Sequence, residues 1–151
     1  LLAVDCAVRC AEMHAGEGEA FLASAAHAIQ NRQPVVVLTS GGGMRIQGGE
    51  ISLSQMPRTT LAVNEVKRNG IPYIIILCDP TAGGITASYA MLGDIHIAEP
   101  GATVAFAGAR VIQGTVKESL PIGVQKSEYT VDEGQSDLVV QRKDIPRKLE
   151  N

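Results

Sequence analysis

The fold of this chain is decided by one stretch, Tyr73-Ile74-Ile75-Ile76-Leu77-Cys78-Asp79-Pro80-Thr81-Ala82-Gly83-Gly84. Its opening apolar run is typical of a strand that is buried on both faces, as in a parallel sheet. We expect Asp79-Pro80 to end that strand. The two glycines precede a segment rich in Ala and Ser that indicates a helix, so they lie where a loop becomes a helix N-terminus.

The pair Gly83-Gly84 is compatible with two roles. The first backbone N–H groups of a helix have no partner inside the helix, and a residue without a Cβ lets a substrate atom approach them closely. This arrangement is typical of an anion or oxyanion site. The alternative is that the glycines only permit a tight turn and close packing of the helix on the sheet.

A second unit of the same kind lies earlier in the chain. Residues 35–38 form a buried apolar strand, and the loop 39–49 holds five glycines without the Gly-Lys-Ser/Thr of a P-loop. A helix over 51–69 follows, which Pro57 should kink or split. Right-handed crossovers would place both glycine loops at one edge of a parallel sheet. Open α/β sheets bind their ligands at that edge.

The rest of the chain predicts shorter elements, because apolar residues recur there at helical or strand spacing. A charged tail follows residue 140. The expected helices span 20–31, 111–119 and 127–133, and the expected strands span 1–8, 94–98, 102–106 and 136–140.

Composition narrows the class of protein. The 151 residues are 45% hydrophobic and suffice for one domain, 1–151. A formal net charge of -3 predicts no general affinity for nucleic acid, and no apolar run approaches the ~20 residues of a membrane helix. Three cysteines without a C-x-x-C pair argue against a disulfide framework and a zinc site and favour a reduced, cytoplasmic setting. Because the chain does not begin with Met, we expect it to be a piece of a longer protein.

Catalytic side chains are sparse in this sequence. The three histidines form no metal-spaced pair, and Ser40 and Ser88 lack the G-x-S-x-G setting of a hydrolase. We expect Cys78, Asp79 and His96 to be structural. The remaining candidates are the backbone N–H donors of the glycine loops. Such donors favour reactions that develop negative charge on a carbonyl oxygen, as in enolate formation.

Several long motifs resemble the carboxyltransferase beta subunit of bacterial acetyl-CoA carboxylase. The longest covers residues 79–94, and the resemblance runs over roughly residues 34–149. Shorter matching motifs are Ala98-Glu99-Pro100, Phe106-Ala107-Gly108, Arg110-Val111-Ile112, Gln125-Lys126-Ser127-Glu128 and Asp137-Leu138-Val139-Val140.

This resemblance implies a single α/β domain with the crotonase-like spiral of β-β-α units, truncated relative to the family and without its zinc ribbon. It implies the transfer of a carboxyl group from carboxybiotin, carried on a biotin carboxyl carrier protein, to acetyl-CoA to form malonyl-CoA. A homologous alpha subunit would complete the active site, so we expect an oligomer in which this chain alone is inactive. No metal and no directly bound cofactor are expected.

The resemblance also implies residue roles. Gly83 and Gly84 would hold the thioester oxygen as the enolate forms. The substrate-binding residues would be Gly41, Gly42, Gly43, Arg45, Gly108 and Arg110, with the two arginines as candidates for the CoA phosphates because guanidinium groups bind phosphate in bidentate fashion.

The loop 40–49 departs from the family pattern, because it is one residue longer and lacks the Glu that follows Gln47 in the family. Two alternatives therefore remain open beside the leading hypothesis. One is a subunit of another biotin-dependent acyl-CoA carboxylase or decarboxylase. The other is a non-catalytic CoA-binding assembly subunit.

Overall fold

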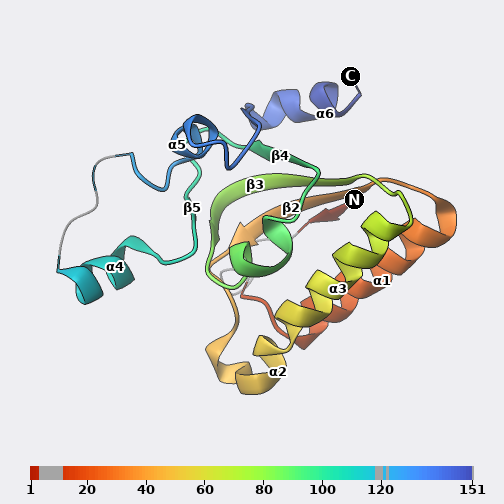
Figure 1. Ribbon diagram of the computed structural model, residues 1–151, viewed down its shortest axis with the longest axis horizontal. Helices are drawn as coiled ribbons and strands as arrows, with labels where there is room; N and C mark the ends of the chain where they lie inside the picture. Colours follow the sequence, from red (N-terminus) through yellow and green to blue (C-terminus); the bar gives the residue numbers. More distant parts are fainter. Residues whose placement is uncertain (4–11, 118–120, 122, 151) are drawn as a thin grey trace.

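The computed structural model describes residues 1–3, 12–117, 121 and 123–150, and its centre is a parallel sheet (Figure 1). The sheet has six strands in the order β1-β2-β3-β4-β6, and β5 pairs with β3 beyond the end of β4. The strands are β1 (Leu2–Ala3), β2 (Val35–Gly41), β3 (Tyr73–Ala82), β4 (Ile95–Ala98), β5 (Val104–Ala105) and β6 (Leu138–Val139).

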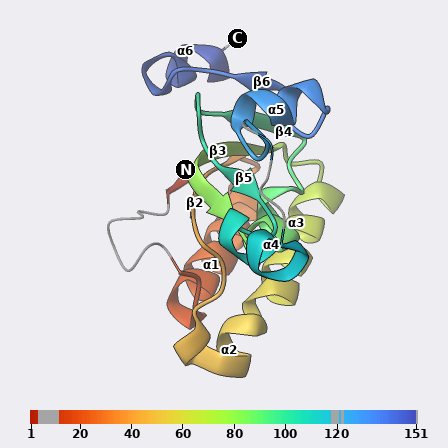
Figure 2. The same cartoon turned by 90° about the vertical axis from the view of Figure 1, so that its left-hand side faces the viewer.

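Helices cover the sheet unequally. The long helices α1 and α3 lie side by side on one face, whereas α6 lies on the other side of the sheet (Figures 1 and 2). The α-helices are α1 (Ala15–Asn31), α2 (Gly49–Leu53), α3 (Gln55–Arg68), α4 (Ala109–Val116), α5 (Ser127–Asp132) and α6 (Ile145–Leu149). Two 3₁₀ segments, η2 (Ile46–Gly48) and η4 (Arg142–Asp144), and one π-helical turn, η3 (Thr86–Ala90), complete the described part.

The pairing of β2 with β3 confirms the prediction that 35–38 and 73–78 are adjacent parallel strands. Val35 lies opposite Tyr73, and the register continues to Thr39 opposite Leu77. Alternate residues of β3 serve two cores, because successive side chains of a strand point to opposite faces. Ile75 and Leu77 pack in the cluster beneath α1 and α3, while Ile76 and Cys78 pack in the cluster on the other face.

The prediction that Asp79-Pro80 ends the strand is wrong, because β3 continues to Ala82. The ladder with β2 skips from Leu77 to Thr81 through an irregularity between Thr39 and Gly41. A proline without an N–H is tolerated at such a break in the ladder.

Pro57 splits the helix expected over 51–69, as predicted. The chain forms α2 up to Leu53 and a separate α3 from Gln55. Pro57 has no N–H to donate to the Leu53 carbonyl, so the α-helical ladder cannot run through this point.

Three further predictions change, two of them at the ends of the chain. The residues after 140 are not a mere charged tail: Ile145 of α6 is buried against the second core cluster. Of the strand expected over 1–8, Leu2–Ala3 pairs with β2, and residues 4–8 lie outside the described residues. The helix expected over 111–119 is α4, which ends at Val116 within the described part of the chain.

No helix in the described part of the chain has the length and apolar character needed to cross a membrane.

Candidate functional site

The two glycine loops meet at the carboxyl edge of the sheet, as the sequence predicted. A Cβ added to Gly83 would lie only 2.7 Å from the Gly42 carbonyl oxygen, and a Cβ added to Gly43 would lie 3.2 Å from the Gly84 nitrogen. Gly43 and Gly83 have φ angles of 129° and 63°, which favour glycine. The glycines therefore serve close packing, and they also bring backbone N–H groups of one loop against the bare Cα atoms of the other.

The N–H groups of Gly83 and Gly84 differ in availability. Gly83 donates to the carbonyls of Ala105 and Phe106, at 3.1 and 3.0 Å. None of the hydrogen bonds given by the described residues uses the Gly84 N–H. Of the two glycines expected at the thioester oxygen, Gly84 therefore remains the candidate donor. Gly83 instead anchors the turn to the segment after β5.

The first glycine loop is fixed from outside by Met13. Its N–H donates to the Gly43 carbonyl at 2.9 Å, and its carbonyl accepts the Arg45 N–H at 2.9 Å. Met13 is buried and directly precedes His14, whose imidazole caps α1 by accepting the Gly16 N–H. Sequence reasoning missed this contact, because a bridge made by one residue has no periodicity.

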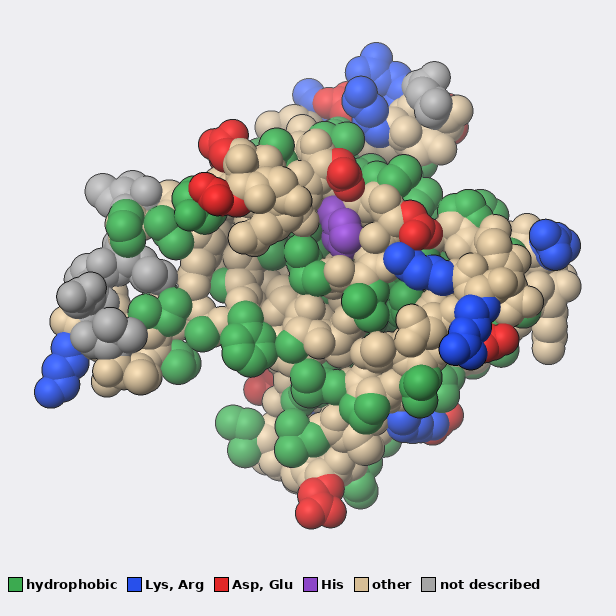
Figure 3. All heavy atoms as spheres, in the orientation of Figure 1, with side chains coloured by type: hydrophobic (Ala, Val, Ile, Leu, Met, Phe, Trp, Pro, Cys, Tyr) green, Lys and Arg blue, Asp and Glu red, His purple; other side chains and the backbone are tan. Residues whose placement is uncertain are grey.

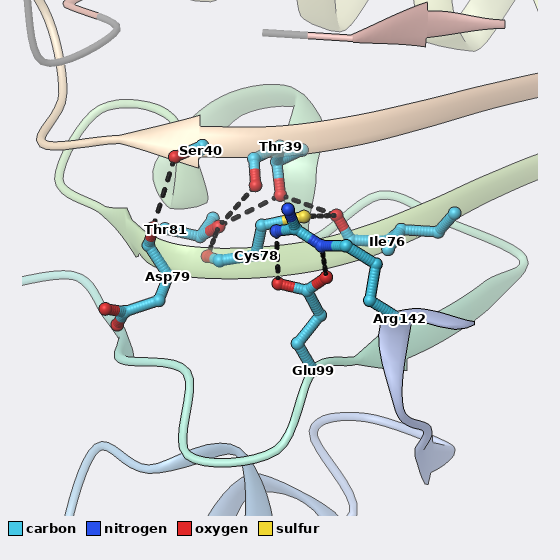
Figure 4. A network of polar contacts seen from close by, with 8 residues as sticks. All are labelled: Thr39, Ser40, Ile76, Cys78, Asp79, Thr81, Glu99 and Arg142. Carbon is cyan, nitrogen blue, oxygen red and sulfur yellow. Dashed lines mark hydrogen bonds and ion pairs between the residues drawn. The ribbon is translucent and has the colours of Figure 1, made fainter. Parts of the chain in front are cut away.

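Hydroxyl groups join β2 to β3 just before the glycines (Figure 4). The Thr39 and Thr81 hydroxyls lie 3.0 Å apart, and Thr81 also donates to the Cys78 carbonyl at 2.8 Å or to Thr39 at 3.1 Å. The Ser40 hydroxyl reaches the Asp79 carbonyl at 3.3 Å. These bonds satisfy carbonyls that the irregular ladder leaves free, so both strands hold their loops in fixed positions.

Asp79 and Cys78 are structural, as expected. The Asp79 carboxylate accepts the Thr103 N–H at 2.7 Å and so ties β3 to the approach of β5. Burial, and next the negative charge of Glu99, raise the pKa of the Cys78 thiol to about 11. A buried, protonated thiol is a poor nucleophile. Glu99 in turn forms a two-point ion pair with Arg142 of η4 (Figure 4).

His96 is also structural. Its Nε2 accepts the Gly93 N–H at 3.1 Å, in the turn that leaves η3. Burial lowers the pKa of His96, and the charge of Asp137 partly offsets this effect. Burial therefore favours the neutral imidazole, whose Nε2 accepts a hydrogen bond from the turn.

The remaining candidates lie around the two loops. Arg45 is partly exposed, two residues beyond Gly43. Gly108 is the N-cap of α4, where its carbonyl accepts the N–H groups of Val111 and Ile112. Arg110 occupies the first turn of α4, and its side chain is outside what the structure describes.

Metal binding finds no support in the residues at hand. Within 1–3, 12–117, 121 and 123–150, no group of three or more His, Cys, Asp and Glu residues could hold a metal ion. Cys6 and Cys10 lie outside the described residues. The absence of zinc therefore stays a prediction.

Two glycine loops touch at the carboxyl edge of a parallel sheet, and one of them offers a backbone N–H donor to a carbonyl oxygen. This α/β arrangement agrees with the crotonase-like fold that the resemblance implies. Residues 1–142 match the carboxyl transferase domain family. The chain belongs to that family.

Two of its curated relatives carry the same name. The chain is 67% identical over 135 residues to the acetyl-coenzyme A carboxylase carboxyl transferase subunit beta of Pelagibacter ubique, a match that covers 89% of this chain and 44% of that protein. It is 55% identical over 137 residues to the protein of the same name from Caulobacter vibrioides, covering 91% and 44%. The chain thus spans less than half the length of these relatives.

Solved structures of low sequence identity share the fold. A transcarboxylase 12S structure with methylmalonyl-coenzyme A bound superposes with a TM-score of 0.85 at 24% identity, covering 96% of this chain and 29% of that one. The hetero-dimer of Pseudomonas malonate decarboxylase gives 0.80 at 18% identity, covering 92% and 62%.

Proposed function

We propose that this chain is the acyl-CoA-binding part of a carboxyltransferase that moves a carboxyl group from carboxybiotin to acetyl-CoA, in fatty acid synthesis. The observation that carries the proposal is the Gly84 N–H, which has no acceptor among the described residues and lies beside the bare Cα of Gly43. The name of the 67% identical relative supports this choice of reaction.

The proposed chemistry needs a donor rather than a side-chain nucleophile. Carboxybiotin releases its carboxyl group as CO2, and the biotin left behind takes a proton from the methyl group of the bound thioester. Negative charge then develops on the thioester oxygen, until the methyl carbon bonds to the CO2 to give malonyl-CoA. The Gly84 N–H donates to that oxygen, and one such donor contributes about 3 kcal/mol at the transition state. Carboxybiotin is a co-substrate that supplies the carboxyl group.

The other candidate residues would bind the substrate. The loop Gly41–Gly43 lets the thioester approach the sheet edge, because a side chain at Gly43 would crowd the Gly84 nitrogen. Arg45 and Arg110 are proposed for the CoA phosphates, and Gly108 for the substrate contact beside them.

A partner chain completes the proposal. The segment carrying α4 projects from the body, and hydrophobic side chains lie along it (Figure 3). Phe106 is 70% exposed and Val111 is 62% exposed. We propose that a homologous alpha subunit covers this arm, that a biotin carboxyl carrier protein delivers carboxybiotin, and that the assembly works in the cytoplasm.

Reconstitution tests this proposal. The natural full-length protein, an alpha subunit and carboxybiotinylated carrier protein are mixed with acetyl-CoA, and malonyl-CoA is measured. We expect malonyl-CoA only when both subunits are present. Acyl-CoA binding without any carboxyl transfer in the complete mixture would instead favour the non-catalytic assembly role, while transfer only to another acyl-CoA would favour a different carboxylase.

A further inference from the structure

Two methionines cover the side of Gly84 where a side chain would stand. A Cβ added to Gly84 would lie 2.8 Å from Cγ and 3.1 Å from Cε of Met44, and 3.2 Å from Sδ of Met56. Both methionines are partly exposed beside Gly84, and Met44 also packs against the core cluster beneath α1 and α3. The proposed function assigns them no role.

The two side chains reach this place from separate elements. Met44 follows the first glycine loop directly, where Met13 brackets it by bonding to Gly43 and Arg45. Met56 stands in the first turn of α3, just after the break at Ser54. The hydrogen bonds of Met13 and the break between α2 and α3 therefore bring the two flexible thioethers together beside Gly84.

The distances place these thioethers within reach of an acyl group. A thioester oxygen that accepts the Gly84 N–H lies about 3 Å from its nitrogen. The carbonyl carbon and the first acyl carbon follow within two covalent bonds of that oxygen. Met44 and Met56 already fill the side of Gly84 where a Cβ would stand, so an acyl chain that extends from its first carbon toward that side meets the two thioethers.

We propose that Met44 and Met56 form a wall that limits the acyl group to a short chain such as acetyl, an inference that rests on the proposed function. Methionine is unbranched and adaptable, so the wall closes around a methyl group and must be displaced by a longer chain. An added methylene in an apolar pocket changes discrimination by roughly 10- to 200-fold.

The experiment compares acetyl-CoA with butyryl-CoA in the reconstituted full-length complex. Met44→Ala and Met56→Ala should each shift the ratio of kcat/KM toward butyryl-CoA by about 10-fold or more. Met56→Leu, which keeps most of the volume, should leave the ratio within about twofold of the wild type. Met91→Ala is the matched control, because Met91 lies at the end of η3 and lines a separate hollow with Ala87 and Phe106.

The outcomes separate this inference from the function beneath it. A wild type that carboxylates acetyl-CoA, together with both alanine variants at the wild-type ratio, overturns the wall. An equal shift of the kcat/KM ratio in Met91→Ala also overturns the wall, because it would show that loosened packing anywhere near the site changes the ratio. If the wild type carboxylates no acyl-CoA, the proposed function is overturned, and the inference about Met44 and Met56 is overturned as well.

Discussion

Gly42 and Gly43 are neighbours that a side chain would affect very differently. A Cβ on Gly42 meets no heavy atom within 4 Å. At Gly43, the φ of 129° is unfavourable for any other residue, and the Cβ would stand 3.2 Å from the Gly84 nitrogen and 3.5 Å from the Gly83 Cα. The close contact between the loops therefore depends on Gly43.

Gly43→Ala should accordingly lower the free energy of unfolding by about 1–3 kcal/mol, the cost of a residue held in a sparsely populated backbone region. Gly42→Ala, in open space, should stay within about 0.5 kcal/mol of the wild type. Urea denaturation of the full-length variants measures both. Equal stability of the two variants would show that the loops are not in the contact described.

A side chain at Gly84 is a less informative change. Alanine or valine there would push against Met44 and Met56, so lost activity would mix a blocked site with disturbed packing. The Gly84 N–H itself must be changed to isolate its contribution.

At the scale of elements, η3 links the candidate site to the far end of the sheet. The turn begins beyond Gly84, and it ends beside His96, which accepts the Gly93 N–H. Three charged groups surround His96: Asp137 before β6, Asp94 before β4, and Lys67 at the end of α3. Asp94 also accepts the Tyr73 N–H at 2.8 Å and pairs with Lys67 at 2.9 Å.

This arrangement predicts a pH-dependent stability. Burial lowers the pKa of His96 in the folded state, while a histidine in the unfolded state has a pKa of about 6.5. The unfolded state therefore binds the proton more readily, so the contribution of neutral His96 is present above about pH 6.5 and is lost as the pH falls through the lower, folded pKa. The free energy of unfolding should decline over that window.

His96→Gln should flatten the decline, and His27→Gln, on an exposed position of α1, should keep it. Denaturation curves between about pH 5 and 8 provide the measurement. An unchanged slope in His96→Gln would show that this imidazole does not couple folding to protonation.

At the scale of the whole molecule, the sheet could be predicted where the sequence pattern is local. The apolar runs 35–38 and 73–78 and the glycines after them determine the two central strands and the edge where their loops meet. Pro57 likewise marks the helix break, because a missing N–H acts on its own helix.

Three features could not be predicted from the sequence pattern, because they depend on contacts between residues far apart in the chain. Pro80 is tolerated inside β3 only because the ladder with β2 is irregular there. Ile145 lies in a segment with too few apolar residues to show a period, and its burial follows from how α6 docks beside β6. The Gly83 N–H is not available to a ligand, because it donates hydrogen bonds to the carbonyls of Ala105 and Phe106. These hydrogen bonds depend on the path of the chain after β5.

Proteins that form larger assemblies share the fold of this chain. Transcarboxylase 12S, described as a hexamer, and malonate decarboxylase, described as a hetero-dimer, share the fold of this chain. The α4 segment projects from the body (Figure 1) and carries the exposed side chains Phe106 and Val111.

The most direct test of the central claim replaces the amide of Gly84 by an ester, with glycolic acid in place of glycine in the full-length protein. This removes one N–H group and adds no side chain that could meet Met44. In the reconstituted complex we predict a kcat about 100-fold lower or more, with KM for acetyl-CoA changed little and the melting temperature preserved. Full carboxyl transfer by the Gly84 ester would contradict the claim that this N–H stabilises the thioester oxygen.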